Sequence, residues 1–68
     1  MTIRELLDQF GIEGKFIITT WNEKTEEDII LSKGEQAEYQ IWNNDNGVLD
    51  RKIICMYAID EVLNIEVE

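Results

Sequence analysis

The first ten residues carry the hydrophobic spacing of an amphipathic helix. Four apolar residues fall at i, i+3, i+4 and i+7, which aligns them along one helix face: Ile3, Leu6, Leu7 and Phe10. Thr2 and Glu5 have the spacing of a capping box, in which each side chain satisfies the backbone N–H of the other residue. Gly11 follows where a left-handed residue can end the helix. The pattern predicts a helix over residues 2–10.

After Gly14 the hydrophobic period changes from that of a helix to that of a strand. Residues 15–21 are rich in β-branched and aromatic side chains that alternate between two faces, so we expect a first strand there. Residues 22–27 are polar, and residues 29–32 predict a second, short strand. Residues 38–42 predict a third strand. Residues 43–47, Asn-Asn-Asp-Asn-Gly, predict a turn because these residue types tolerate positive φ.

The C-terminal third predicts a hairpin. Residues 52–59 are apolar at both odd and even positions, which is typical of a central strand buried on two faces. Residues 62–67 alternate between apolar and polar side chains, as in a half-buried strand. A helix over residues 58–66 is the competing interpretation, and the alternation favours the strand. Asp60 and Glu61 separate the two strands without the glycine that tight hairpin turns prefer, so the register stays open.

These elements predict an α+β fold. One short helix and four to five strands are too few for a doubly wound sheet, so we expect a mainly antiparallel sheet with helix 2–10 packed on one face. The helix stripe would contact the strands at 15–21, 52–59 and 62–67. The 68 residues make a single domain, and their 44% hydrophobic content is sufficient for a core.

Composition narrows the chemistry. The chain has no histidine, which excludes Ser-His and Cys-His nucleophile pairs and histidine metal ligands. The single cysteine, Cys55, lies in an apolar run, so we expect a buried and unreactive thiol in a reducing compartment. No glycine motif for phosphates or dinucleotides is present. We therefore expect no enzymatic activity, no metal site and no cofactor.

Charge is the most unusual property. Fifteen acidic residues against six basic ones give a formal net charge of −9. Such an excess repels nucleic acid and anionic membranes and favours a protein partner with a basic surface. The N-terminus lacks the pattern of a signal peptide and no apolar run is long enough to span a membrane, so we expect a cytoplasmic protein.

Two groups of residues are candidates for partner binding. The first is the acidic segment with Glu23, Glu26, Glu27 and Asp28, whose carboxylates can imitate a row of phosphates. A solvated face that only keeps the domain soluble is the competing interpretation. The second group is aromatic, with Trp21, Tyr39 and Trp42 at predicted strand ends. Such residues serve as interface anchors, and packing at the edge of the core is the alternative.

Two segments of the sequence carry a resemblance. The opening residues 1–7 and the closing stretch 48–67, with its run Val48-Leu49-Asp50-Arg51-Lys52-Ile53-Ile54, resemble small acidic proteins without a defined activity. That class is encoded by low-GC Gram-positive bacteria and by their phages and mobile elements. The resemblance implies an intracellular α+β domain and brings no catalytic residues. By analogy of size and charge it suggests an inhibitor of a host defence protein, as anti-CRISPR proteins are.

The leading hypothesis is thus a non-enzymatic protein-binding module whose acidic face engages a basic surface. Its sharpest form is an inhibitor that competes with nucleic acid for that surface. The alternative is a structural subunit that forms homo-oligomers through its sheet and uses its charge for solubility.

Overall fold

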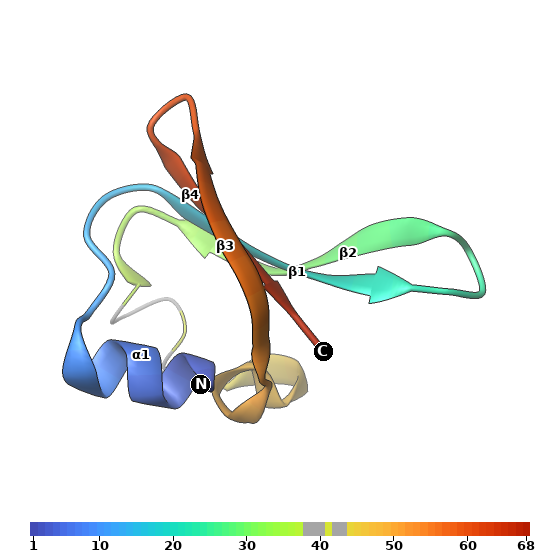
Figure 1. Ribbon diagram of the computed structural model, residues 1–68, viewed down its shortest axis with the longest axis horizontal. Coiled ribbons are helices and arrows are strands. Elements are labelled where there is room, and N and C mark those ends of the chain that lie inside the picture. Colours follow the sequence, from blue (N-terminus) through green and yellow to red (C-terminus); the bar gives the residue numbers. More distant parts are fainter. Residues whose placement is uncertain (38–40, 42–43) are drawn as a thin grey trace.

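The computed structural model describes residues 1–37, 41 and 44–68. Within this part of the chain the elements are one α-helix, one 3-10 helix and a four-stranded sheet (Figure 1). In chain order they are α1 (Ile3–Gln9), β1 (Phe16–Asn22), β2 (Glu27–Gly34), η1 (Asp45–Asp50), β3 (Ile53–Ile59) and β4 (Val62–Val67). The predicted α+β class is confirmed.

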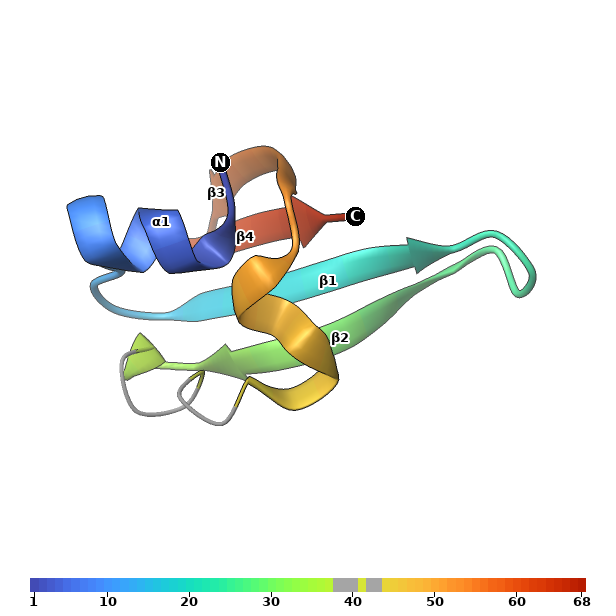
Figure 2. The same ribbon diagram turned by 90° about the horizontal axis from the view of Figure 1, so that it is seen from below.

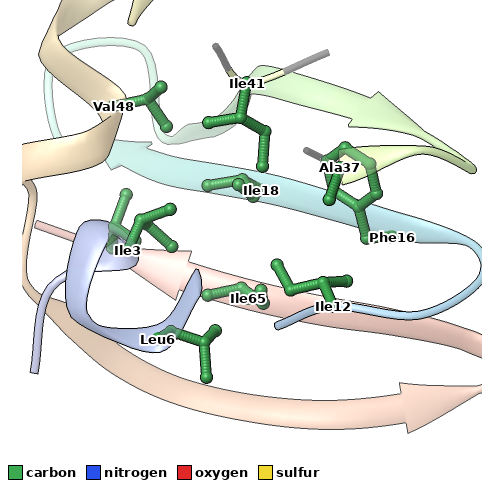
Figure 3. Close-up of a cluster of buried hydrophobic side chains, with 10 residues drawn as sticks. Ile3, Leu6, Ile12, Phe16, Ile18, Ala37, Ile41, Val48 and Ile65 are labelled. Atoms are coloured by element: carbon green, nitrogen blue, oxygen red, sulfur yellow. The ribbon is translucent and has the colours of Figure 1, made fainter. Parts of the chain in front are cut away.

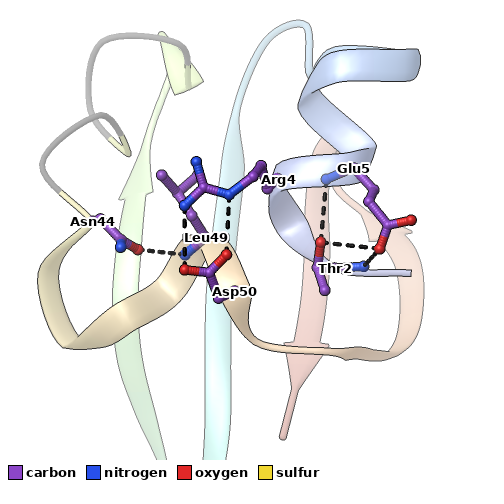
Figure 4. A network of polar contacts seen from close by, with 6 residues as sticks. All are labelled: Thr2, Arg4, Glu5, Asn44, Leu49 and Asp50. Carbon is purple, nitrogen blue, oxygen red and sulfur yellow. Dashed lines mark hydrogen bonds and ion pairs between the residues drawn. The ribbon is translucent and has the colours of Figure 1, made fainter.

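The capping box at the start of α1 is confirmed. Thr2 Oγ1 accepts the backbone N–H of Glu5 at 3.2 Å, and Glu5 Oε1 accepts the backbone N–H of Thr2 at 3.1 Å (Figure 4). The helix ends at Gln9, and Gly11 takes a φ of +77°. The N–H of Gly11 donates to the carbonyl of Leu6 at 2.9 Å, so the glycine closes the helix as predicted.

The predicted apolar stripe is wrong at its last position. Phe10 is 74% exposed, whereas Ile3 and Leu6 are buried and Leu7 is partly buried. Phe10 is the C-cap residue with a non-helical backbone (φ −124°), so it no longer follows the helical spacing that would place it over the core. Ile12, beyond the turn, is buried in the core.

The sheet is mixed, with the order β2-β1-β4-β3. The pairs β1–β2 and β3–β4 are antiparallel hairpins, and the central pair β1–β4 is parallel. Two of the three pairings are therefore antiparallel, in agreement with the prediction. A β-bulge in β2 leaves Leu31 without a partner in β1 and lets it pack against the core.

The predicted place of residues 52–59 in the sheet is wrong. The segment expected to be central, residues 52–59, forms the edge strand β3, and most of its residues are exposed. β4 lies instead between β1 and β3, with Ile65 and Val67 buried. The apolar side chains at odd and even positions of this segment predict a strand that is buried on both faces. The strand order is instead set by the parallel pairing of β1 with β4, and the local hydrophobic pattern carries no information about that pairing.

The middle of the chain differs from the prediction in another way. The third strand expected at 38–42 falls almost entirely outside the described residues; Ile41 is described and is buried. The predicted turn at 43–47 leads into η1, which was not predicted. Asn44, Asn46 and Gly47 have positive φ values of 52°, 59° and 63°, in line with the turn chemistry of these residue types.

One face of the sheet is covered. Its inward side chains meet those of α1 and of the segments before β1 and β3 in a single buried cluster (Figure 3). The cluster comprises Ile3, Leu6, Ile12, Phe16, Ile18, Ala37, Ile41, Val48, Ile65 and Val67. Both helices lie on this inner face (Figure 2).

Polar contacts fix η1 beside α1. The Arg4 guanidinium forms two hydrogen bonds with the carboxylate of Asp50, at 3.0 and 3.2 Å, and lowers the pKa of Asp50 (Figure 4). Asn44 Oδ1 accepts the N–H of Leu49 at 2.8 Å. Arg51 donates to the carbonyls of Asn46 and Glu68, at 3.0 and 2.9 Å, and so ties η1 to the C-terminus of the chain. No helix among the described residues is long and apolar enough to cross a membrane.

Candidate interaction surface

The β1–β2 hairpin projects beyond the rest of the sheet (Figure 1). β4 pairs with β1 only from Phe16 to Thr20, so the ends of β1 and β2 continue as a two-stranded arm. The tip begins with an Asx-type turn in which Asn22 Oδ1 accepts the N–H of Lys24 at 2.9 Å. It ends at Glu26, whose φ of 54° turns the chain into β2.

The structure brings the four predicted carboxylates together on this arm. We call Glu23, Glu26, Glu27 and Asp28 the acidic tip. All four are exposed. The ion pairs found among the described residues, Arg4–Asp50 and Lys15–Glu35, involve none of them. Lys24 is the one basic residue within the tip segment. The acidic tip therefore presents charge that the described part of the chain leaves largely uncompensated.

Of the three predicted aromatic anchors, the structure describes one. Trp21 is 56% exposed and lies opposite Asp28 in the β1–β2 register. Cross-strand partners share a face, so the indole and the Asp28 carboxylate are neighbours on the same side of the arm. Tyr39 and Trp42 lie outside the described residues.

Trp21 belongs to the face of the sheet that points away from the core, which we call the outer face. The strand registers place twelve side chains on it: Ile17, Thr19, Trp21, Asp28, Ile30, Lys33, Cys55, Tyr57, Ile59, Val62, Asn64 and Glu66. Neither α1 nor η1 covers this face (Figures 1 and 2). It combines exposed apolar and aromatic side chains with acidic ones.

Cys55 is exposed, which contradicts its predicted burial. It follows the bulge at Ile54 on the edge strand and pairs with Glu66. Its thiol donates to Glu66 Oε2 at 3.4 Å, and this hydrogen bond, together with partial desolvation, raises the pKa of Cys55. The thiol is therefore weakly nucleophilic, as expected, but the main cause is a neighbouring carboxylate and not apolar burial.

Tyr57 connects the edge strand with the acidic arm. Partial desolvation raises the pKa of Tyr57, and the charges of Glu66 and Asp28 add to the effect. Asp28 lies on β2 and Tyr57 on β3, at opposite edges of the sheet. Asp28 is the one member of the acidic tip among these causes, and its effect is smaller than those of desolvation and of Glu66.

Tyr57 and Glu66 also belong to this surface, and the sequence does not predict that. Its pattern places both residues in hairpin strands and Glu66 on a solvated face. The order of the strands brings β4 beside β1 and so places Glu66 next to Thr19. That order depends on contacts far apart in the sequence.

Among the described residues no three Asp, Glu or Cys side chains converge as metal ligands. A shallow hollow at the start of β1, far from the tip, is lined by Lys15, Phe16, Ile17, Lys33, Gly34, Glu35 and Val62. It brings together no nucleophile and base.

No protein-family model, curated protein or solved structure matches the chain.

Proposed function

We propose that this protein is a non-enzymatic binding module that engages the basic surface of a partner protein through its acidic tip and the adjoining outer face. The observation that carries the proposal is the arm itself. Its four carboxylates stand beyond the body of the sheet, exposed and outside the ion pairs found in the described residues.

Position supports a docking role over solubility alone. Carboxylates that only keep a domain soluble can be spread over its whole surface. Here four of them occupy six consecutive residues at the end of a protruding hairpin. A concentrated field of one sign speeds association with an oppositely charged partner and makes that association sensitive to salt.

The indole beside Asp28 supports a guanidinium or ammonium group as the element that is recognised. A cation over an aromatic ring is favoured by roughly 0.5–2 kcal/mol, and arginine combines such stacking with a fork of donors suited to carboxylates. Trp21, Asp28 and Glu27 offer these two chemistries at the base of the acidic tip. An arginine-rich partner surface matches both.

A groove that holds nucleic acid is one such surface. A row of carboxylates on a narrow hairpin can occupy the positions of phosphates along it. In this finer form of the proposal the protein is an inhibitor that competes with nucleic acid for its partner.

The proposal can be tested by calorimetric titration with an oligoarginine peptide. We expect binding to the wild type at low ionic strength that weakens steeply as salt rises. The double substitution Glu26→Lys and Glu27→Lys should abolish it. Asp8→Lys with Glu13→Lys is the matched control, because it changes the net charge equally at exposed positions outside the arm.

Two outcomes would contradict the proposal. If both double variants lose affinity equally, the peptide responds to net charge and not to the arm. If wild-type binding is indifferent to salt, the interaction is not electrostatic. Trp21→Ala separates the aromatic contribution, and we expect it to weaken binding about threefold to thirtyfold.

A further inference from the structure

The edge strand β3 differs from the edge strand β2 in its lack of charge. β2 carries Glu27, Asp28 and Lys33, and charged side chains on an edge strand discourage pairing with other chains. Each of the two strands contains one bulge, so the charge is what distinguishes them. β3 reads Ile-Ile-Cys-Met-Tyr-Ala-Ile, without a charged residue or a proline. Its Ile54, Met56, Tyr57 and Ile59 are 61%, 46%, 43% and 55% exposed.

Among the described residues, contacts on the free side of β3 are found at its start. There the Ile53 N–H donates to the carbonyl of Met1 at 2.8 Å, and Thr2 forms a bridge with Lys52. The two-residue turn at Asp60 and Glu61, both with positive φ, makes Ile59 and Val62 the hydrogen-bonded pair that closes the hairpin. Because backbone groups alternate along an antiparallel ladder, those of Ala58 and Met56 point to the free side.

Charge flanks β3 with opposite signs at its two ends. Arg51 and Lys52 precede the strand, and Asp60 and Glu61 follow it. The Arg51 side chain is engaged with the carbonyls of Asn46 and Glu68, whereas no ion pair is found for Lys52 among the described residues. A strand that is basic at one end, apolar along its length and acidic at the other is complementary to an antiparallel copy of itself.

We propose that β3 pairs antiparallel with β3 of a second copy of this chain and forms a symmetric dimer with a continuous eight-stranded sheet. With Tyr57 opposite the same residue of the second copy, Met56 pairs with Ala58 in both directions. The backbone groups on the free side are then satisfied. Glu61 of each copy then comes close to Lys52 of the other, at the end of the shared ladder, where Met1 and Thr2 of that copy occupy the free side.

The choice of a second copy follows from this complementarity. A strand with charge of one sign would match only one of the two charged ends of β3, whereas a second copy in antiparallel orientation matches both. The acidic tips do not prevent dimerisation. In the dimer they lie at the two outer edges of the eight-stranded sheet, seven strand spacings or about 33 Å apart, which exceeds the Debye length of about 8 Å at physiological salt.

A charge-swap series tests the dimer by sedimentation velocity over a range of concentrations. The wild type should shift from monomer to dimer as concentration rises. Lys52→Glu should raise the dissociation constant about tenfold, because it replaces two symmetry-related attractions by repulsions. Glu61→Lys should do the same, and the double variant should restore wild-type dimerisation. Lys33→Glu, on the other edge strand, is the matched control and should have no effect.

Recovery of dimerisation in the double variant would show that residues 52 and 61 interact between copies, because within one copy they lie about 25 Å apart and cannot pair. A monomer at every concentration would overturn the proposal. So would a double variant that stays as weak as the single ones. The dimer does not depend on the proposed basic partner, and an oligoarginine titration of Lys52→Glu tests that partner separately.

A cross-linking experiment tests the register. In a Cys55→Ser background, Tyr57→Cys should form an intermolecular disulfide on oxidation, because facing residues of a non-hydrogen-bonded pair lie within disulfide distance. Ile59→Cys in the same background should not, since its counterpart in the second copy is residue 55. Equal cross-linking of both variants, or of neither, would contradict this pairing.

Discussion

The turn between β3 and β4 contains two non-glycine residues with left-handed backbone conformations. Asp60 and Glu61 have φ values of 50° and 67° and form the turn of the β3–β4 hairpin. Two-residue turns of this kind favour asparagine and glycine, because a side chain with a Cβ atom is strained at positive φ. The sequence places a glutamate where glycine would fit best. The hairpin is therefore held by its strands in spite of its turn.

Substitution of Glu61 by glycine should stabilise the protein. Relief of the strained φ favours the folded state by roughly 1 kcal/mol, and the greater freedom of glycine in the unfolded chain offsets part of this gain. Glu13→Gly is the control, since Glu13 does not have positive φ, and it should destabilise. Urea denaturation of both variants provides the comparison. A loss of stability in Glu61→Gly would mean that the turn does not have the described geometry.

The capping box makes a pH-dependent contribution to stability. The backbone N–H of Thr2 is the main cause of the lowered pKa of Glu5. A carboxyl with a lower pKa in the folded state stabilises that state above its unfolded pKa, and this stabilisation is lost as pH falls through the folded value. The loss should occur below about pH 4.

We therefore expect the stability difference between the wild type and Glu5→Gln to be largest near neutral pH and to disappear in acid. Thermal unfolding of both proteins between neutral pH and pH 3 measures this difference. Thr2→Ala, which removes the cap itself, should cost about 1 kcal/mol near neutral pH. A difference between wild type and Glu5→Gln that persists in acid would exclude the ionised cap as its source.

At the scale of elements, the sequence predicts structure that depends on neighbouring residues but not the pairing of distant strands. The capping box of Thr2 and Glu5 and the turn chemistry of Gly11 fixed α1 from residues close in sequence. The places of β3 and β4 could not be predicted in that way. Residues 53–59 are apolar on both sides, yet they lie at the edge, because β4 pairs in parallel with β1 across more than forty residues of chain.

The candidate surface shows the same division. The acidic tip is contiguous in sequence, so its four carboxylates can be identified as a group from the sequence alone. Tyr57 and Glu66 join it only through the strand order, so sequence patterning alone did not reveal them. Phe10 was misplaced for a local reason, since the helix ended one residue before it.

The strand order predicts unequal responses to the same substitution. Ile65→Val in the central strand should cost about 0.5–1.5 kcal/mol, because a methylene is removed from a fully buried site. Ile59→Val, at a residue that is 55% exposed on the edge, should cost much less. Urea denaturation at a concentration that keeps the protein monomeric makes the comparison. Equal costs would support a central β3 and contradict the edge position.

At the scale of the whole molecule, the net charge of −9 opposes folding through self-repulsion while it favours a basic partner. Because screening weakens the repulsion, sodium chloride should raise the melting temperature at neutral pH. The Glu26→Lys and Glu27→Lys variant, whose net charge is −9 + 4 = −5, should melt higher at low salt and respond less to added salt. An unchanged salt response would show that the acidic tip does not contribute to the repulsion.

We propose separate roles for the two edges of the sheet. The acidic tip at one edge would engage a basic partner, and the uncharged strand β3 at the other would pair with a second copy. Trp21 lies on the arm beside β2 and Met56 lies on β3, so signals from these two residues report on the two roles separately.

The most direct measurement is a residue-by-residue map of amide and indole NMR shifts during titration with oligoarginine. We expect the largest changes at the Trp21 indole and at residues 22–28, with smaller changes at Tyr57 and Glu66 on the outer face. Residues 3–9 of α1 should not change. Shifts that centre on α1, or that spread evenly over all acidic residues, would contradict a docking role for the acidic tip.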